Sequence, residues 1–269
     1  MQGHRKNIVI TAGGTTEKID NVRYITNMST GKLGATICDT ILAQNSTEVE
    51  KIYYIYATKS VMPVAHKKVE LISVTGAYDL KEKVETLLSR VKIDFFIHSM
   101  AVSDYTTDYV SGTKRLSEEI TNKIWDFRQN IFKAELTELV SKVLESPDNI
   151  IDTSNKMSSE QSEIIIKLKQ TPKVISIIKD IQPQTVLIGF KLLSGVTEEE
   201  LIAVASNLLV KNKCDYVVAN DLVNIKDGEH KAVILDKFGN KTHVNGKDVI
   251  AVGIAEICAG DPCGRPVGR

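Results

Sequence analysis

Short apolar runs alternate with amphipathic stretches along the first 100 residues. "KNIVITAGG", "KIYYIYA", "VELISV" and "IDFFIHSM" are compact apolar segments of strand length. Between them, apolar residues recur at helical spacing over 31–45, and residues 77–90 form a second helical pattern. Strands that alternate with helices in this way predict a parallel sheet covered by helices.

The same alternation resumes near the C-terminal end. "EIIIKLK" and "TVLIGF" are predicted strands, separated by a helix that opens at Pro172. Thr197 and Glu200 have the spacing of a capping box and predict another helix start. "CDYVVAND" is a further strand, and "KAVILD" and "KTHV" are joined across "KFGN" as a hairpin. The predicted fold class is therefore α/β, a Rossmann-like, mostly parallel sheet flanked by helices, with a C-terminal β-hairpin.

The middle of the chain departs from this pattern. Residues 105–162 are more polar, with one helical stretch near 131–144, and we interpret them as an irregular insertion or lid loop within a single domain over 1–258. The tail 259–269 is rich in Gly and Pro, and we expect it to be disordered.

Composition excludes several classes of function. The chain has 34 basic and 34 acidic residues, so net charge gives no reason to expect binding to nucleic acid or an anionic membrane. No apolar run approaches the roughly 20 residues that span a bilayer, and the first run is too short for a signal peptide. Cys38 and Cys214 lie in apolar patterns and the cysteines lack metal-type CxxC spacing, which favours a reducing cytoplasm.

The stretch "NMSTGKLG" contains a Gly-Lys pair but is not a phosphate loop. A P-loop needs glycine where Thr26 stands and Ser or Thr where Leu33 stands. The stretch does place hydroxyl and amide groups at a predicted helix N-terminus, behind Arg23, and such a terminus favours a phosphate or carboxylate. The alternative is a simple N-cap by Ser29 or Thr30.

Gly13 and Gly14 follow the first predicted strand, where backbone amides can approach a phosphate. A dinucleotide site would need GxGxxG opening a helix directly and an acid at the end of the second strand. Here 17 residues separate Gly14 from Lys32, and the second strand ends in "YATKS" without an acid. A nicotinamide dehydrogenase is therefore disfavoured.

Other strand ends carry weaker signals. Asp104 could bind a metal or a hydroxyl, or only form an Asx turn, and His98 lies within an apolar run as a core histidine would. Phe190 and Asn220 follow later strands, where an aromatic ring beside an amide could hold a nucleobase. Lys156 is a lone lysine in a polar loop, which by itself indicates a solvated charge.

Four motifs together resemble a known family. "ITAGGTTEKIDNVRYITNMSTGKLG", "AVSDY", "IGFKL" and "VVAND", in this order, are similar to phosphopantothenate–cysteine ligase in its free-standing bacterial form, over Asn7 to His243. The resemblance implies a ligase that activates 4′-phosphopantothenate with a nucleoside triphosphate, as an acyl-nucleotidylate, and joins it to L-cysteine in coenzyme A biosynthesis. It also implies Mg²⁺, CTP as co-substrate with ATP open, and a homodimer.

The resemblance also implies roles for individual residues. Asn27 and Lys156 would be catalytic, and Asn27 would also contact pantothenate. Arg23 would reach the phosphopantothenate of the neighbouring subunit. The remaining implied contacts are Gly13, Ser29, Gly31 and Gly34 with the phosphates and sugar, Phe190 and Asn220 with the base, and Ala101 and Asp104 with the pantothenate arm.

Two departures leave an alternative open. Met100 stands where this family usually has alanine, and the segment 105–155 is longer than in the free-standing bacterial enzymes. A nucleotide-binding regulatory module of the same fold, without ligase activity, would also be consistent with these features. The resemblance implies no particular metal ligands.

Overall fold

The computed structural model describes residues 4–127, 132–158, 162–225 and 229–260. The chain divides into two compact units: unit 1 comprises Met1–Thr16, Thr26–Ser103 and Pro172–Arg269, and unit 2 comprises Glu17–Ile25 and Asp104–Thr171. That both fold together as one domain over 1–258 stays a prediction.

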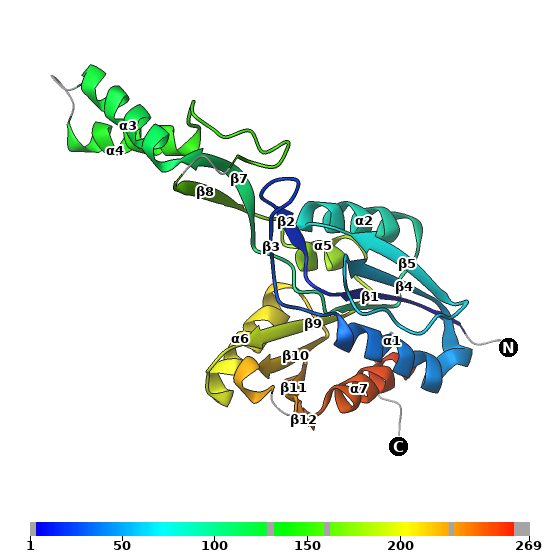
Figure 1. Ribbon diagram of the computed structural model, residues 1–269. Coiled ribbons are helices and arrows are strands. Elements are labelled where there is room, and N and C mark those ends of the chain that lie inside the picture. Colours follow the sequence, from blue (N-terminus) through cyan, green and yellow to red (C-terminus); the bar gives the residue numbers. More distant parts are fainter. Residues whose placement is uncertain (1–3, 128–131, 159–161, 226–228, 261–269) are drawn as a thin grey trace. The chain divides into compact units, whose positions relative to one another are not determined.

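Unit 1 is built on an eight-stranded sheet (Figure 1). Its order is β12-β11-β10-β9-β6-β1-β4-β5, and neighbouring strands are parallel except that β11 is antiparallel to both β10 and β12. β11 and β12 form the predicted hairpin. The strands are β1 Lys6–Ala12, β4 Val49–Ala57, β5 Val69–Val74, β6 Phe95–His98, β9 Val186–Leu193, β10 Tyr216–Asp221, β11 Lys231–Asp236 and β12 Lys241–Asn245.

The strand order reverses between β1 and β6. From β1 the chain moves outward to β4 and β5, then returns to β6 on the other side and continues to β9 and β10. Ile8 pairs with Phe95 and Thr11 with His98, so both strands end at the same edge of the sheet. In open parallel sheets, ligands bind beyond the carboxyl ends of strands at such a reversal.

Helices cover both faces of this sheet. Within the described residues, α1 Lys32–Asn45 and α7 Lys247–Ala259 pack on one face, and α2 Ala77–Arg90, α5 Val174–Ile181 and α6 Glu198–Lys211 on the other. Alternate residues of β1 show why: Ile8 and Ile10 belong to the first apolar core and Val9 to the second. Strands buried on both faces are therefore apolar throughout, which explains the short unbroken runs in the sequence. The 3₁₀ turns are η1 Ser46–Glu48 and η2 Leu222–Asn224.

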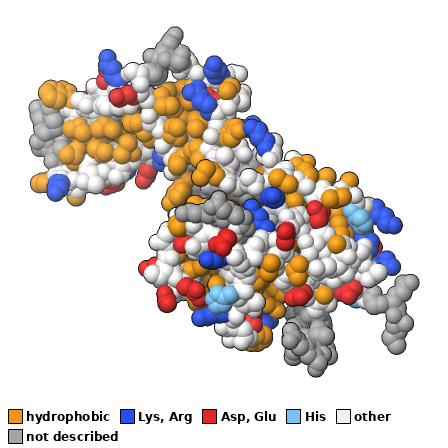
Figure 2. All heavy atoms as spheres, turned by 60° about the horizontal axis from the view of Figure 1, so that its bottom comes forward, with side chains coloured by type: hydrophobic (Ala, Val, Ile, Leu, Met, Phe, Trp, Pro, Cys, Tyr) orange, Lys and Arg blue, Asp and Glu red, His pale blue; other side chains and the backbone are white. Residues whose placement is uncertain are grey.

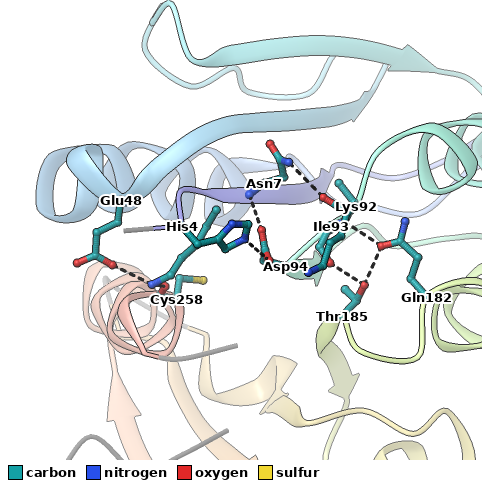
Figure 3. Close-up of polar contacts among 10 residues, drawn as sticks. His4, Asn7, Glu48, Lys92, Ile93, Asp94, Gln182, Thr185 and Cys258 are labelled. Carbon is teal, nitrogen blue, oxygen red and sulfur yellow. Dashed lines mark hydrogen bonds and ion pairs between the residues drawn. The ribbon is translucent and has the colours of Figure 1, made fainter. Parts of the chain in front are cut away.

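The amino ends of the central strands are held by buried polar groups (Figure 3). Asp94 accepts hydrogen bonds from the backbone N–H of Asn7 and from the His4 ring, both at 2.9 Å. The Lys6 amine donates to the Cys258 and Ala259 carbonyls at 2.9 Å each and pairs with Glu48 at 2.8 Å. Because the last carbonyls of a helix lack intrahelical partners, Lys6 fixes the C-terminal end of α7 beside the first strand.

Unit 2 has its own regular structure. β7 Tyr105–Gly112 and β8 Ile164–Gln170 form an antiparallel pair, and α3 Thr113–Phe127 and α4 Lys133–Glu145 lie between them in sequence. Buried Glu119 of α3 accepts hydrogen bonds from the backbone N–H groups of Asp148 and Asn149. A short ladder of β2 Thr16–Lys18 and β3 Tyr24–Thr26 completes the described strands.

The predicted α/β fold class is confirmed, but the middle segment is more regular than the sequence indicates. The predicted irregular insertion contains β7 and α3 as well as the expected helix, and "EIIIKLK" pairs with β7 instead of joining the central sheet. α3 was missed because its Leu116, Ile120 and Ile124 are diluted by charged residues. α7 extends to Ala259, whereas 261–269 and Cys263 lie outside the described residues.

No helix in the described part of the chain is long and apolar enough to cross a membrane.

Hydrophobic side chains gather on the face of unit 2 that Figure 2 shows at its upper left. The large exposed apolar residues of this unit are Val22, Tyr24, Tyr105, Trp125, Phe127, Phe132, Leu144, Ile150, Ile164, Ile165 and Leu168. An accumulation of this kind marks an interaction surface more often than an ordinary monomer surface.

Candidate functional site

Two loops meet beyond the carboxyl ends of β1 and β6, all within unit 1. Gly14 and Ala101 form an isolated parallel bridge, the N–H of Ala101 donates to the Gly13 carbonyl at 2.8 Å, and the N–H of Thr15 donates to the Ala101 carbonyl at 3.1 Å. The Thr15 hydroxyl accepts from the backbone N–H of Ser103 at 2.8 Å. The two strand ends that the sequence marked as candidates are thus joined at the reversal of the sheet.

The N-terminus of α1 opens toward these loops. Gly31, not Ser29 or Thr30, is the N-cap residue, and in the described structure no side chain caps it. The Thr30 hydroxyl lies a long 3.4 Å from the N–H of Lys32, and the first turn carries no acid. The simple N-cap is therefore not what this stretch forms. Uncapped N–H groups together with the helix dipole suit an anion.

Glycine is required where this terminus meets β1. Gly13 and Gly31 have φ angles of 90° and 74°, a region that side chains rarely adopt. A Cβ on Gly13 would lie 1.9 Å from the Ser60 Oγ. The loop after β4, which carries Ser60, thereby closes one side of the glycine loop. The sequence analysis did not predict this contact, because a serine in "YATKS" gives no signal by itself.

Asn27 lies against the end of β6. Its Nδ2 donates to the Ala101 carbonyl at 3.2 Å, its own carbonyl accepts from the N–H of Ser29 at 2.9 Å, and the side chain is otherwise exposed. The structure therefore places Asn27, Ser29 and Ala101 beside the glycine loop.

A buried hydroxyl and imidazole support the loop from below. Thr11 Oγ1 is 3.0 Å from Nδ1 of His98 and accepts from the N–H of Met100 at 3.2 Å. Burial lowers the pKa of His98 to about 4, so the ring is neutral at pH 7. His98 is confirmed as a core histidine, and Met100 is buried in the core beside it. Thr11, an ordinary strand residue by pattern, gave no signal in the sequence.

The two predicted base-contacting residues differ from expectation. Phe190 lies inside β9, half-buried against the α1-side core, and is not an exposed aromatic at a strand end. Asn220 is only 8% exposed, and its Nδ2 is 3.3 Å from Nε2 of His230. Both follow the alternation that places Val218 in the core under α1 and α7, so they lie on the α1 face of the sheet.

The other predicted site residues belong to unit 2. Arg23 pairs with buried Asp20 at 2.8 Å and also donates to the Met157 carbonyl. Burial alone would raise the pKa of Asp20, but hydrogen bonds from the N–H groups of Val22, Arg23 and Met157 and from the guanidinium hold it well below its ordinary value. Asp104 is exposed, and Lys156 is exposed next to buried Met157, on a loop that this ion pair anchors.

No group of three or more His, Cys, Asp or Glu side chains that could hold a metal ion exists among the described residues.

The reversed strand order, with a glycine loop over an uncapped helix, defines a Rossmann-like α/β protein. Residues 3–132 and 149–260 match the DNA/pantothenate metabolism flavoprotein C-terminal domain, and the chain belongs to that family.

Individual relatives agree with this assignment. The crystal structure of the DNA/pantothenate metabolism flavoprotein from Streptococcus pneumoniae is 34% identical and superposes with a TM-score of 0.76 over 95% of this chain and 98% of that one. The C-terminal domain of a coenzyme A biosynthesis bifunctional protein CoaBC shares the fold at 21% identity and a TM-score of 0.63, over 96% of each chain. The CoaBC protein of Thermococcus kodakarensis is 28% identical over 86% of this chain but only 45% of its own length. The chain spans less than half the length of the curated relatives it matches first.

Proposed function

We propose that this protein is a phosphopantothenate–cysteine ligase of coenzyme A biosynthesis. The observation that carries the proposal is the junction of the Gly13–Gly14 loop, Asn27 and Ala101 at the uncapped N-terminus of α1. Membership of the pantothenate metabolism family and likeness to coenzyme A biosynthesis proteins support the choice of substrates.

The reaction needs two anions to be held together. The carboxylate of 4′-phosphopantothenate attacks the α-phosphorus of the nucleotide, and the bond to pyrophosphate breaks. The cysteine amine then attacks the acyl carbon of the acyl-nucleotidylate, the nucleoside monophosphate leaves, and the amine proton passes to solvent. Most of the rate enhancement must come from positioning and charge neutralisation, since no protein nucleophile takes part.

The residues of this chain suit those tasks. The α1 N-terminus and the amides of Gly13, Gly31 and Gly34 bind the phosphates, together with Ser29. Asn27, already directed at the Ala101 carbonyl, donates to the acyl oxygen of the intermediate, while Ala101 and Asp104 contact the pantothenate arm. Phe190 packs beside the base and Asn220 hydrogen-bonds it. Lys156 neutralises phosphate charge as it develops.

The nucleotide enters as its Mg²⁺ complex, with CTP as the proposed donor. Mg²⁺ usually keeps several waters and binds through substrate phosphates with one or two carboxylates. The described residues, which offer no three-ligand cluster, suit an ion that arrives with the substrate. ATP in place of CTP would change the donor but not the ligase.

The first test is pyrophosphate release from the purified protein with 4′-phosphopantothenate, cysteine and Mg²⁺, run with CTP and with ATP. We expect release with CTP and formation of phosphopantothenoylcysteine only when cysteine is present. Asn27→Ala should lower kcat about 100-fold or more, the usual loss when a donor to a developing charge is removed.

Asn45→Ala is the matched control, because Asn45 also donates to a backbone carbonyl, that of Ala255 at 2.8 Å, at the other end of α1. It should retain the wild-type kcat. If nucleotide binds but neither CTP nor ATP yields pyrophosphate, the protein is a binding module and not a ligase.

We further propose a homodimer in which Arg23 reaches the phosphopantothenate of the partner. The exposed apolar side chains of unit 2, Trp125, Phe132 and Ile164 among them, support an interface on this unit. The Arg23 side chain pairs with Asp20 but is still 45% exposed. Part of its guanidinium therefore remains accessible to a ligand.

Light scattering should give the mass of two chains. Mixing Arg23→Ala protein with Asn27→Ala protein should restore activity to roughly a quarter of the wild-type value, because half of the dimers are mixed and one of their two sites is intact. A single-chain mass, or no recovery after mixing by mild denaturation, would contradict the shared site.

A further inference from the structure

Asn220, on the α1 face of the sheet, and His230 form a buried pair in which each residue is 8% exposed. The Asn220 Nδ2 and the His230 Nε2 are 3.3 Å apart. The histidine backbone is fixed on both sides: its N–H donates to Asn245 Oδ1 at 3.0 Å, and its carbonyl accepts from the N–H of Gly246 at 3.1 Å. The ring is thus held against Asn220 by the end of β12 and has little freedom of its own.

The ring is neutral at pH 7. Burial, and then the positive charge of Lys247, lower the pKa of His230 below its ordinary value. A neutral imidazole has one donor nitrogen and one acceptor nitrogen. With Nδ2 of Asn220 as the donor, Nε2 is the acceptor and Nδ1 carries the proton. His230 Nδ1 has no hydrogen-bond partner among the described residues, although it is buried.

A carboxamide that is free to rotate can present either its oxygen, which accepts a hydrogen bond, or its NH₂ group, which donates one. It can therefore bind an amino group or an oxo group equally well. A carboxamide whose Nδ2 is tied to an acceptor behind it keeps Oδ1 for the ligand. Among the described residues, the Asn220 side chain makes one hydrogen bond, and its partner is His230. The fixed Oδ1 can accept from an exocyclic amino group but faces the oxygen of an oxo base with another acceptor.

We infer that His230 is a positioning residue that fixes the Asn220 carboxamide, so that the site selects nucleotides bearing an exocyclic amino group, such as cytosine or adenine, over their oxo counterparts. This inference rests on the proposed function insofar as Asn220 contacts the base. His230 itself does not touch the nucleotide.

The test compares amino and oxo nucleotides that are otherwise alike, CTP with UTP and ATP with ITP. The quantity compared is kcat/KM for the amino nucleotide divided by kcat/KM for its oxo counterpart. In the wild type this ratio should exceed one for the pair that contains the preferred nucleotide. His230→Phe keeps the ring volume but removes the acceptor, and should lower that ratio about tenfold, as expected for one hydrogen bond that fixes a buried amide. The change should appear in the nucleotide KM, with kcat at saturating amino nucleotide unaltered.

His230→Gln can offer a side-chain oxygen to Nδ2 and should keep more of the ratio than His230→Phe. Thr185→Val is the structural control, because Thr185 also makes a buried hydrogen bond, to the Ile93 carbonyl at 2.8 Å, but at the amino end of β9. It should leave the ratio unchanged. A wild-type protein that does not distinguish the two members, or an unchanged ratio in folded His230→Phe protein, overturns the inference.

Two readouts separate this inference from the ligase proposal. Calorimetric titration gives the ratio of Kd values without turnover, so absence of pyrophosphate release with a normal binding ratio refutes only the ligase. Nitrogen-15 histidine spectra of the wild type, assigned by the signal lost in His230→Phe, should show Nε2 unprotonated at pH 7. A proton on Nε2 would mean that His230 donates to Oδ1 of Asn220, so that Oδ1 is not free for the ligand. This result would refute the inference even if the variants fail to fold. Absence of binding by all four nucleotides refutes both.

Discussion

Gly34→Ala should abolish most of the activity while leaving a folded protein. Gly34 is buried in the first turn of α1, and an added Cβ would lie 2.7 Å from the Ala12 Cβ at the end of β1 and 3.1 Å from the Ser99 Oγ. Neither Ala12, with its short side chain on a central strand, nor the helix backbone can move alone. The N-terminus of α1 must therefore shift away from the strand ends.

We expect a fall in kcat/KM of about 100-fold, the loss that a misplacement of about 1 Å produces in a positioned site. The free energy of unfolding should decrease by only about 1–3 kcal/mol, which is typical of overpacking by one methyl group. Pyrophosphate release and urea unfolding measure the two effects separately.

Gly253→Ala is the matched control. Gly253 also lies within a helix, α7, but its Cβ would meet only the Ile234 Cδ1 at 3.1 Å, the end of a flexible side chain. Alanine is favoured over glycine inside helices by about 1 kcal/mol, so this variant should be active and at least as stable as the wild type. Equal activity of the Gly34 and Gly253 variants would show that the α1 N-terminus does not bind the nucleotide.

Lys156→Gln should lower kcat about 100- to 1000-fold with little change in nucleotide affinity. The side chain is exposed and has no described contact that would make it part of the core, so its loss costs little stability. A lysine that neutralises charge only as it develops acts on the transition state and therefore on kcat. Single-turnover pyrophosphate release measures this step directly.

Lys133→Gln provides the comparison, because Lys133 is an exposed lysine of the same unit at the start of α4. It should behave as wild type. Lys156→Arg restores the charge but not the compact ammonium, and should recover part of the rate. A normal kcat in the Lys156→Gln protein would show that Lys156 is only a solvated surface charge, as its polar loop indicates.

The fold of unit 1 could be predicted because its signals are local. The strands are short unbroken apolar runs, and the Thr197–Glu200 capping box, which the structure confirms, marks the start of α6. Unit 2 could be predicted only in part: the helix near 131–144 and the strand "EIIIKLK" were expected, whereas β7 and α3 were not. β7 is mixed in polarity and becomes a strand through its pairing with β8, from Tyr105 with Gln170 to Gly112 with Ile164.

The candidate site divides in the same way. The glycines and Asn27 were found because they follow strand ends and belong to a motif that resembles a family. Thr11, Ser60 and His230 were not, because each meets its partner only after folding, as Thr11 meets His98, Ser60 meets Gly13 and His230 meets Asn220. Phe190 was misjudged as exposed because β9 continues three residues beyond it, to Leu193.

The clasp between Lys6 and the end of α7 has a consequence for biosynthesis. The Cys258 and Ala259 carbonyls that receive the Lys6 amine follow Lys6 by 252 and 253 positions in the chain. At ribosomal rates of about 5–20 residues per second, the amine at the start of β1 waits on the order of tens of seconds for these acceptors. The α1 face of the sheet can close only after α7 has left the ribosome. Until then the nascent chain exposes one side of its central strands, and a chaperone that shields apolar surface has its longest opportunity there.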